Sequence, residues 1–163
     1  MVVVAIIGIL AAVAIPNFAR FTAKSKQSEA KADLAGLYTA ERAFQAEWQT
    51  FDARFLAVGY APVGNMRYEH GFSTDVGDAL LPPSYNGPHG TAANITTATY
   101  CVTDGANACN INQLPQAPGV VAAAAVTQTT MTALAQAFIG GTLEDKWTIN
   151  ELKTLTNTSQ GLP

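Results

Sequence analysis

The chain has 163 residues, of which 48% are hydrophobic and only 13% are charged. That length suits one domain with an appendage, and the charged fraction lies well below the roughly 25% of ordinary soluble domains. A formal net charge of -3 and an isoelectric point near 5.2 argue against a general nucleic-acid binder, and no specific nucleic-acid site is predicted.

Residues 1–16 contain no charged and no polar side chain. As a helix they would extend roughly 24 Å, slightly less than the ~30 Å hydrocarbon core of a bilayer. Leaving them in water would cost on the order of 20 kcal/mol, since each large aliphatic side chain gains roughly 1.5–3 kcal/mol on burial. We therefore expect residues 1–21 to be covered by lipid or by other protein. The side chains concerned are Val2, Val3, Val4, Ile6, Ile7, Ile9, Leu10, Val13, Ile15 and Phe18.

A secretory signal peptide is the first alternative for this segment. It requires a basic region before the apolar run and a small-residue cleavage site after it. No basic residue precedes the run here, and Pro16-Asn17-Phe18 is a poor cleavage site. The strong helix formers Ala, Lys, Glu, Gln, Leu and Arg also continue to about Trp48. The pattern therefore predicts one long helix over residues 1–48.

The last third of this helix is amphipathic. Apolar residues recur at roughly helical intervals from Ala30 to Phe51, opposite a polar face, which predicts a stripe that packs on a sheet. The residues expected to make this helix-to-sheet contact are Leu34, Leu37, Tyr38, Phe44 and Trp48.

Gly8 and Pro16 lie inside the apolar part of the helix. Proline removes one backbone hydrogen bond and collides with the carbonyl four residues earlier, and glycine adds backbone freedom. We expect the helix to kink or loosen between these two residues. An ordinary membrane-helix kink is the alternative interpretation.

The string MVVVAIIGILAAVAIPNF, followed by SKQSEAKADLAGLYTAERAF, resembles the N-terminal helix of bacterial type IV pilins. The resemblance is strong over residues 1–50, and it resumes more weakly in GNMRYEHGF and DKWTINELKTLTN. The residues that match the family's motif are Gly8, Ile9, Leu10, Ala11, Ala14, Ile15, Pro16, Asn17 and Phe18.

The resemblance implies a pilin fold and a life cycle. A membrane-anchored precursor is trimmed by a prepilin peptidase and methylated at its new amino terminus. An ATP-driven machine then extracts it from the inner membrane and adds it to a helical homopolymer on the surface of a Gram-negative bacterium. The apolar helices form the filament core, and the segment corresponding to Gly8–Pro16 is unwound there. Such filaments serve attachment, twitching motility and, in some cases, DNA uptake.

One feature departs from the family pattern. The family's mature chain begins with phenylalanine and carries, at its fifth position, a glutamate that neutralises a neighbour's amino terminus. Here the first acidic residue is Glu29, so that glutamate has no counterpart. Restoring about six residues would lengthen the apolar helix to roughly 33 Å, enough to cross a bilayer. We expect that segment to be missing from this sequence, a genuine variant being the alternative.

Residues 49–163 are predicted to form a globular α+β head with a small antiparallel sheet. The candidate strands are Met66–Phe72, Thr97–Thr103, Thr132–Gly140, Lys146–Asn150 and Lys153–Asn157, the third resting partly on the resemblance. A turn at Asn150-Glu151 should join the last two strands into a C-terminal hairpin that carries Trp147, Ile149 and Leu155. Residues 73–96 and 110–119 are predicted to be surface loops.

Cys101 and Cys109 flank a segment that favours a turn. The simplest interpretation is a disulfide, worth roughly 2.5 kcal/mol by loop entropy, which places the head outside the cytosol. A metal or redox pair is the alternative, but the spacing is not CxxC, and neither His70 nor His89 stands at a motif spacing. No metal or cofactor is predicted.

Catalytic motifs are not evident. No Ser/His/Asp order and no glycine-rich phosphate loop stands out, so we predict that the chain is not an enzyme. Asp75, Asp78 and Asp104 are scattered over predicted loops, where they either bind Ca²⁺ or serve as solvated turn residues.

Four functions are therefore compared: a major type IV pilin, a type II secretion pseudopilin, an electron-conducting filament and a single-span binding protein that never polymerises. The size of the head and the lack of an obvious calcium constellation favour the pilin over the pseudopilin. Core packing explains the aromatic residues more simply than conduction does.

Overall fold

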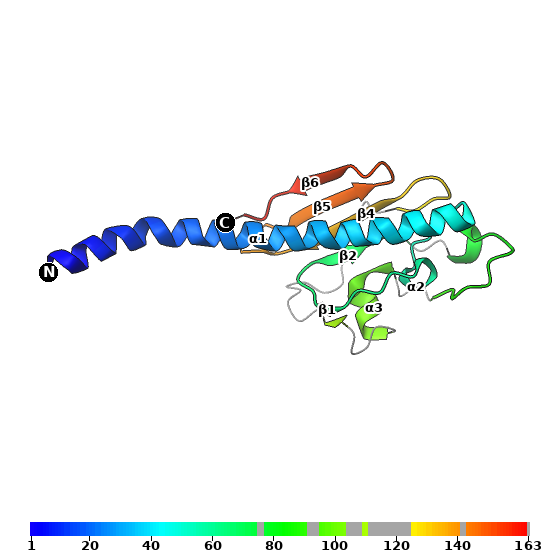
Figure 1. Ribbon diagram of the computed structural model, residues 1–163, viewed down its shortest axis with the longest axis horizontal. Coiled ribbons are helices and arrows are strands. Elements are labelled where there is room, and N and C mark those ends of the chain that lie inside the picture. The colour runs from blue at the N-terminus through cyan, green and yellow to red at the C-terminus, as the bar shows by residue number, and fades with distance from the viewer. Residues whose placement is uncertain (75–76, 91–94, 104–108, 111–124, 141–142, 163) are drawn as a thin grey trace.

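One long helix, α1 (Val2–Trp48), runs the length of the molecule, and the remaining elements gather around its second half (Figure 1). The computed structural model describes residues 1–74, 77–90, 95–103, 109–110, 125–140 and 143–162. The other helical elements are α2 (Phe55–Val58), the 3-10 helix η1 (Gly77–Leu80) and α3 (Thr97–Thr103). The strands are β1 (Gly64–Asn65), β2 (Glu69–Gly71), β3 (Cys109–Asn110), β4 (Thr132–Ala137), β5 (Asp145–Asn150) and β6 (Leu155–Ser159).

The buried face of α1 begins only after its apolar first third. Its buried residues are spaced alternately four and three apart, which places them on one side of a helix. They are Ala23, Gln27, Ala30, Leu34, Leu37, Glu41 and Phe44. The helix ends where Gln49 adopts a left-handed conformation (φ 60°) and its N–H donates to the Gln45 carbonyl at 2.9 Å.

The main sheet is antiparallel throughout, with strand order β2-β4-β5-β6. β4 lies in the interior of the sheet, and its Ala133 and Ala135 are completely buried. Leu34 and Leu37 of α1 share one core cluster with these alanines. β1 and β3 form a separate parallel pair. The predicted α+β fold, with a protruding helix half and a docked half on a small antiparallel sheet, is therefore confirmed.

The prediction of a strand at Thr97–Thr103 is wrong, because these residues form α3. The threonines suggested a strand by propensity, but the Thr96 carbonyl accepts the Tyr100 N–H at 2.9 Å, and the Thr96 hydroxyl accepts the Thr99 N–H at 3.4 Å. A threonine that caps a helix start in this way overrides a strand preference of a few tenths of a kcal/mol per residue.

The other predicted strands exist with different bounds. β2 is shorter than Met66–Phe72, β4 ends before Gly140, and β6 begins two residues later than predicted. The shift of β6 has a local cause: the Asn150 side-chain oxygen accepts the N–H groups of Leu152 and Thr154, at 3.1 and 2.9 Å. These bonds lengthen the hairpin turn. The predicted loop at 73–96 contains η1, while residues 111–119 of the second loop lie outside the described residues.

Candidate assembly segment and head pocket

The first third of α1 projects away from the head (Figure 1). Every large apolar side chain between Met1 and Phe21 is more than half exposed, from 53% at Ile6 to 109% at Met1. All the residues predicted to be covered by lipid or protein, Val2, Val3, Val4, Ile6, Ile7, Ile9, Leu10, Val13, Ile15 and Phe18, are among them. We call residues 1–21 the apolar segment. Within the described residues, α1 is the one helix long and apolar enough to cross a membrane.

Gly8 and Pro16 do not interrupt α1 in the isolated chain, because the helix is continuous through both. Just beyond Pro16, side chains bond to carbonyls one turn earlier: Asn17 donates to Val13 at 3.0 Å and Thr22 donates to Phe18 at 2.9 Å. A side chain at Gly8 would meet nothing within 4 Å. Packing within one subunit therefore does not require this glycine, and the unwound segment stays a prediction for the assembled state.

The docked half of α1 contacts two different surfaces. Leu34 and Leu37 are fully buried against the sheet, and the half-buried Tyr38 donates its hydroxyl to the Glu151 carbonyl at 3.3 Å. Phe44 and Trp48 were also predicted to pack on the sheet, and this is wrong. They belong to a separate cluster with Val58 and Tyr85. The helical stripe is continuous, but α2 and the loop after η1 cover its last turns instead of the strands.

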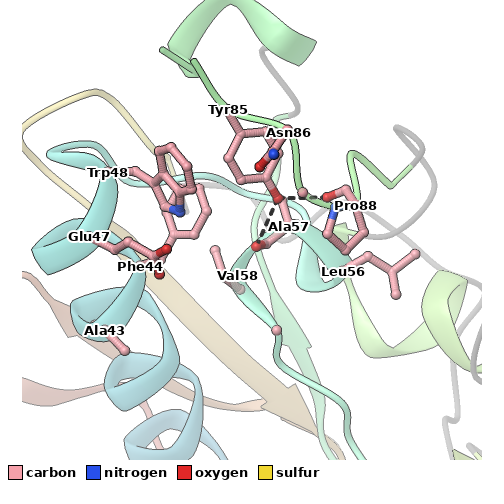
Figure 2. Close-up of a pocket in the computed structure, with 12 residues that line it drawn as sticks. Ala43, Phe44, Glu47, Trp48, Leu56, Ala57, Val58, Tyr85, Asn86 and Pro88 are labelled. Atoms are coloured by element: carbon pink, nitrogen blue, oxygen red, sulfur yellow. Dashed lines mark hydrogen bonds between the residues drawn. The ribbon is translucent and has the colours of Figure 1, made fainter. Parts of the chain in front are cut away.

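That second cluster borders a pocket of about 400 Å³ (Figure 2). The end of α1 forms one side, Leu56 and Pro88 form the other, and Tyr85 lies between them. The Tyr85 hydroxyl bonds to the carbonyls of Pro88 and Ala57, at 2.8 and 3.3 Å, and fixes its ring. The ring meets Trp48 and Phe44 edge-on, with centroids 5.0 and 5.7 Å apart. Sequence reasoning missed this pocket, because Tyr85 was an unremarkable residue of a predicted loop.

Two buried polar groups were also missed. The first lies between α1 and β2. His70 is completely buried, its Nε2 is 2.8 Å from the Tyr60 hydroxyl, and its Nδ1 is 3.9 Å from Asp33 Oδ2. Among the described residues, neither Nδ1 nor Oδ2 has a hydrogen-bond partner. A lone histidine in a strand gave no signal of this pairing, because Asp33 is far away in sequence.

The second is Asp145, the first residue of β5, which is completely buried. Its Oδ1 accepts bonds from the side chains of Gln27 (2.8 Å) and Asn157 (3.2 Å) and from the backbone N–H of Gly161 (3.2 Å). Its Oδ2 accepts bonds from the Tyr68 hydroxyl at 2.7 Å and the Trp147 indole at 2.6 Å. One carboxylate therefore joins the helix, three strand regions and the C-terminal end of the chain.

The remaining predicted residues fall in two places. Cys101 of α3 and Cys109 of β3 are joined in a disulfide, as predicted, while the turn predicted between them, residues 104–108, lies outside the described residues. In the β5–β6 hairpin Ile149 is buried opposite the more exposed Leu155. Trp147 bonds to Asp145, and the Lys31 ammonium lies 4.4 Å from its ring centre.

Comparison with known proteins matches the chain to a pilus protein. Over 78 residues it is 51% identical to the type IV major pilin protein PilA of Myxococcus xanthus (strain DK1622). The resemblance to the type IV pilins is confirmed. The match spans 48% of this chain and about a third of the relative, 36% of its length. No family model matches the chain. The pilin resemblance agrees with the long helix, its exposed apolar segment and the disulfide.

Proposed function

We propose that this chain is a structural subunit that polymerises into a type IV pilus through its apolar segment. The observation that carries the proposal is the exposure of that segment: its large apolar side chains are each more than half exposed, and no described residue of the subunit buries them. Burial of each large side chain gains roughly 1.5–3 kcal/mol, so the segment is stable only in lipid or against other copies. In the filament it forms the core, and the heads form the outer wall.

The same segment would hold the subunit in the inner membrane before assembly. The Cys101–Cys109 disulfide supports a head outside the cytosol, because such bonds persist in oxidising compartments. The proposal also includes processing by a prepilin peptidase and export by the pilus assembly machinery to the surface of a Gram-negative bacterium. The filament would then serve attachment, twitching motility and DNA uptake. They rest on the pilin resemblance and on the name of the relative. A structural role rather than an enzymatic one follows from the same resemblance.

The proposal is tested by placing a charge in the apolar segment. Leu10→Asp, at a side chain 64% exposed in the subunit, should abolish filaments, because a buried unpaired carboxylate is strongly unfavourable in a packed apolar core. The measurement is negative-stain microscopy of material sheared from cells, with immunoblots of the membrane fraction to show that the subunit is made and inserted.

Leu152→Asp is the matched control, since Leu152 is a 77% exposed leucine of the head. It should leave filaments intact. Normal filaments from the Leu10→Asp chain would contradict the proposal, and so would sheared surface material free of any fibre that contains the native subunit.

A further inference from the structure

The pocket at the end of α1 combines aromatic walls with a free carboxylate. Phe44, Trp48 and Tyr85 border it, and Glu47 lies on the same turn of α1 as the first two (Figure 2). Among the described residues no basic side chain forms an ion pair with Glu47, and none of the residues that line the pocket is basic. Its surface is therefore apolar and negatively charged.

Nearby basic side chains are already engaged elsewhere. Arg42, on the same helix, donates to Gln45. Arg54 is buried and pairs with Asp52 and Asp78, each at 2.7 Å. His89, whose ring lies 5.3 Å from that of Tyr85, has its Nδ1 3.0 Å from Asp78. Each of these groups has a partner of its own, so no counterion for Glu47 is found in the part of the chain that the structure describes.

The electrostatic influence of Glu47 reaches the aromatic cluster. The pKa of the Tyr85 hydroxyl is raised, first by burial and then by the charge of Asp52. Arg54 opposes this rise, and Glu47 adds the smallest contribution, which also raises the pKa. Aromatic rings are themselves negative over their faces, and they attract cations within about 6 Å of the ring centre. Aromatic rings recognise quaternary ammonium ligands in proteins, and the negative charge of a neighbouring carboxylate adds to that attraction.

We propose that this pocket binds a small organic cation, namely an alkylammonium or quaternary ammonium group, with Glu47 as its counterion and Trp48 and Tyr85 as its aromatic walls. Its volume of about 400 Å³ lies within the range of small-molecule sites, roughly 300–1,000 Å³. Tyr85 is held in place by two backbone carbonyls, so the site is largely preformed. The proposal does not depend on filament formation, because every residue concerned belongs to one subunit.

Choline is the probe, and 3,3-dimethyl-1-butanol, which has the same shape but no charge, is its neutral counterpart. Both are titrated into the full chain in an uncharged polyoxyethylene detergent while the Trp48 indole N–H resonance is followed by NMR. Choline should bind with a dissociation constant on the order of millimolar, as expected for one partly desolvated cation–π site. The neutral alcohol should bind at least roughly tenfold more weakly.

Glu47→Gln keeps the shape of the side chain and removes its charge. Because Glu47 is exposed, the fold should persist, and choline affinity should fall about tenfold. Glu144→Gln is the matched control: it removes the same charge from a position that does not line the pocket, and it should bind choline as the native chain does.

Three outcomes would overturn the proposal. Equal binding of choline and the neutral alcohol would show a purely apolar pocket. Binding of glucose, added as a neutral sugar, without binding of choline would show a carbohydrate site. No shift of the Trp48 resonance with choline up to about 100 mM, roughly a hundred times the expected constant, would show that the pocket takes no cation.

Discussion

Asp33 and His70 face each other across the contact between α1 and β2, and burial shifts their pKa values in opposite directions. Burial raises the pKa of Asp33 from 3.8 to about 6, with an added rise from the charge of Glu29. Burial lowers the pKa of His70 from 6.5 to about 4, and the polar backbone of the nearby Tyr68 opposes this shift only in part. Tyr60 bonds to the far side of the imidazole, and burial raises its pKa as well.

The two shifts have opposite consequences for stability. An ionised Asp33 destabilises the fold above about pH 6, and this penalty is relieved as pH falls towards 4. A neutral His70 is required by the fold, so stability is lost as pH falls from 6.5 through 4. Because both occur over the same range, the pair should leave the free energy of unfolding nearly independent of pH between about 4 and about 7.

Single substitutions should therefore uncover opposite pH dependences. Asp33→Asn leaves only His70, and the variant should lose on the order of 2 kcal/mol between about pH 7 and about pH 4.5 relative to the native chain. His70→Gln leaves only Asp33, and this variant should gain stability over the same change. Urea unfolding of the full chain in detergent measures the free energy of unfolding of each variant as a function of pH. The double variant should return to the pH dependence of the native chain. If both single variants kept the pH dependence of the native chain, the opposing roles of Asp33 and His70 would be contradicted.

At the scale of elements, α1 is one continuous helix built from two chemically different parts. Its docked half is positioned by the core, whereas its apolar segment has only its own backbone bonds to maintain it. Pro16 cannot donate a backbone hydrogen bond, so the turn before it lacks one of those bonds. The residues between Gly8 and Pro16 are thus the part of α1 whose helical structure is most easily lost on assembly.

Pro16→Ala should strengthen that turn. Alanine restores the missing N–H and is roughly 3 kcal/mol more favourable than proline in a helix interior. If subunits must unwind here to pack, the variant should form fewer filaments, or filaments that extend less under force. Counts of sheared pili and force–extension curves of single pili measure this effect. Native piliation together with native extensibility would argue that unwinding at Pro16 plays no part in assembly.

At the scale of the whole molecule, the carboxylate of Asp145 connects the head to α1 through hydrogen bonds. Asp145 collects donors from Gln27 of α1, from Tyr68 just before β2, and from Trp147, Asn157 and Gly161 at the C-terminal end of the sheet. The apolar segment is carried outward on the helix that this cluster anchors.

Asp145→Asn should therefore destabilise the whole head. The amide places an N–H where the native chain has an acceptor, so buried donors lose their partner, at a cost on the order of 3 kcal/mol in the free energy of unfolding. Glu144→Gln is the neighbouring control, because its 2.7 Å ion pair with Lys146 is partly exposed and contributes less than about 1 kcal/mol. Chemical unfolding in detergent compares the two variants, and equal losses would argue against a special role for Asp145.

Much of the structure could be predicted from local sequence patterns. The uncharged run at residues 1–16, the helical composition up to Trp48 and the short Cys101–Cys109 spacing each depend on neighbours in the chain, so the apolar segment, α1 and the disulfide could be predicted. Side-chain periodicity also located the β5–β6 hairpin. Residue propensity predicted a strand where α3 forms, because the helix there is started by a threonine cap.

Sequence alone determined that residues 1–21 must be covered by lipid or protein, because an uninterrupted apolar helix is not stable in water. Tertiary structure alone decided where the polar groups of the head meet. Gln27 and Asp145 are 118 residues apart, and the pocket forms only where the end of α1 meets α2 and Tyr85. Periodicity reports which face of an element is buried, whereas the identity of the residue across that face is fixed by long-range packing.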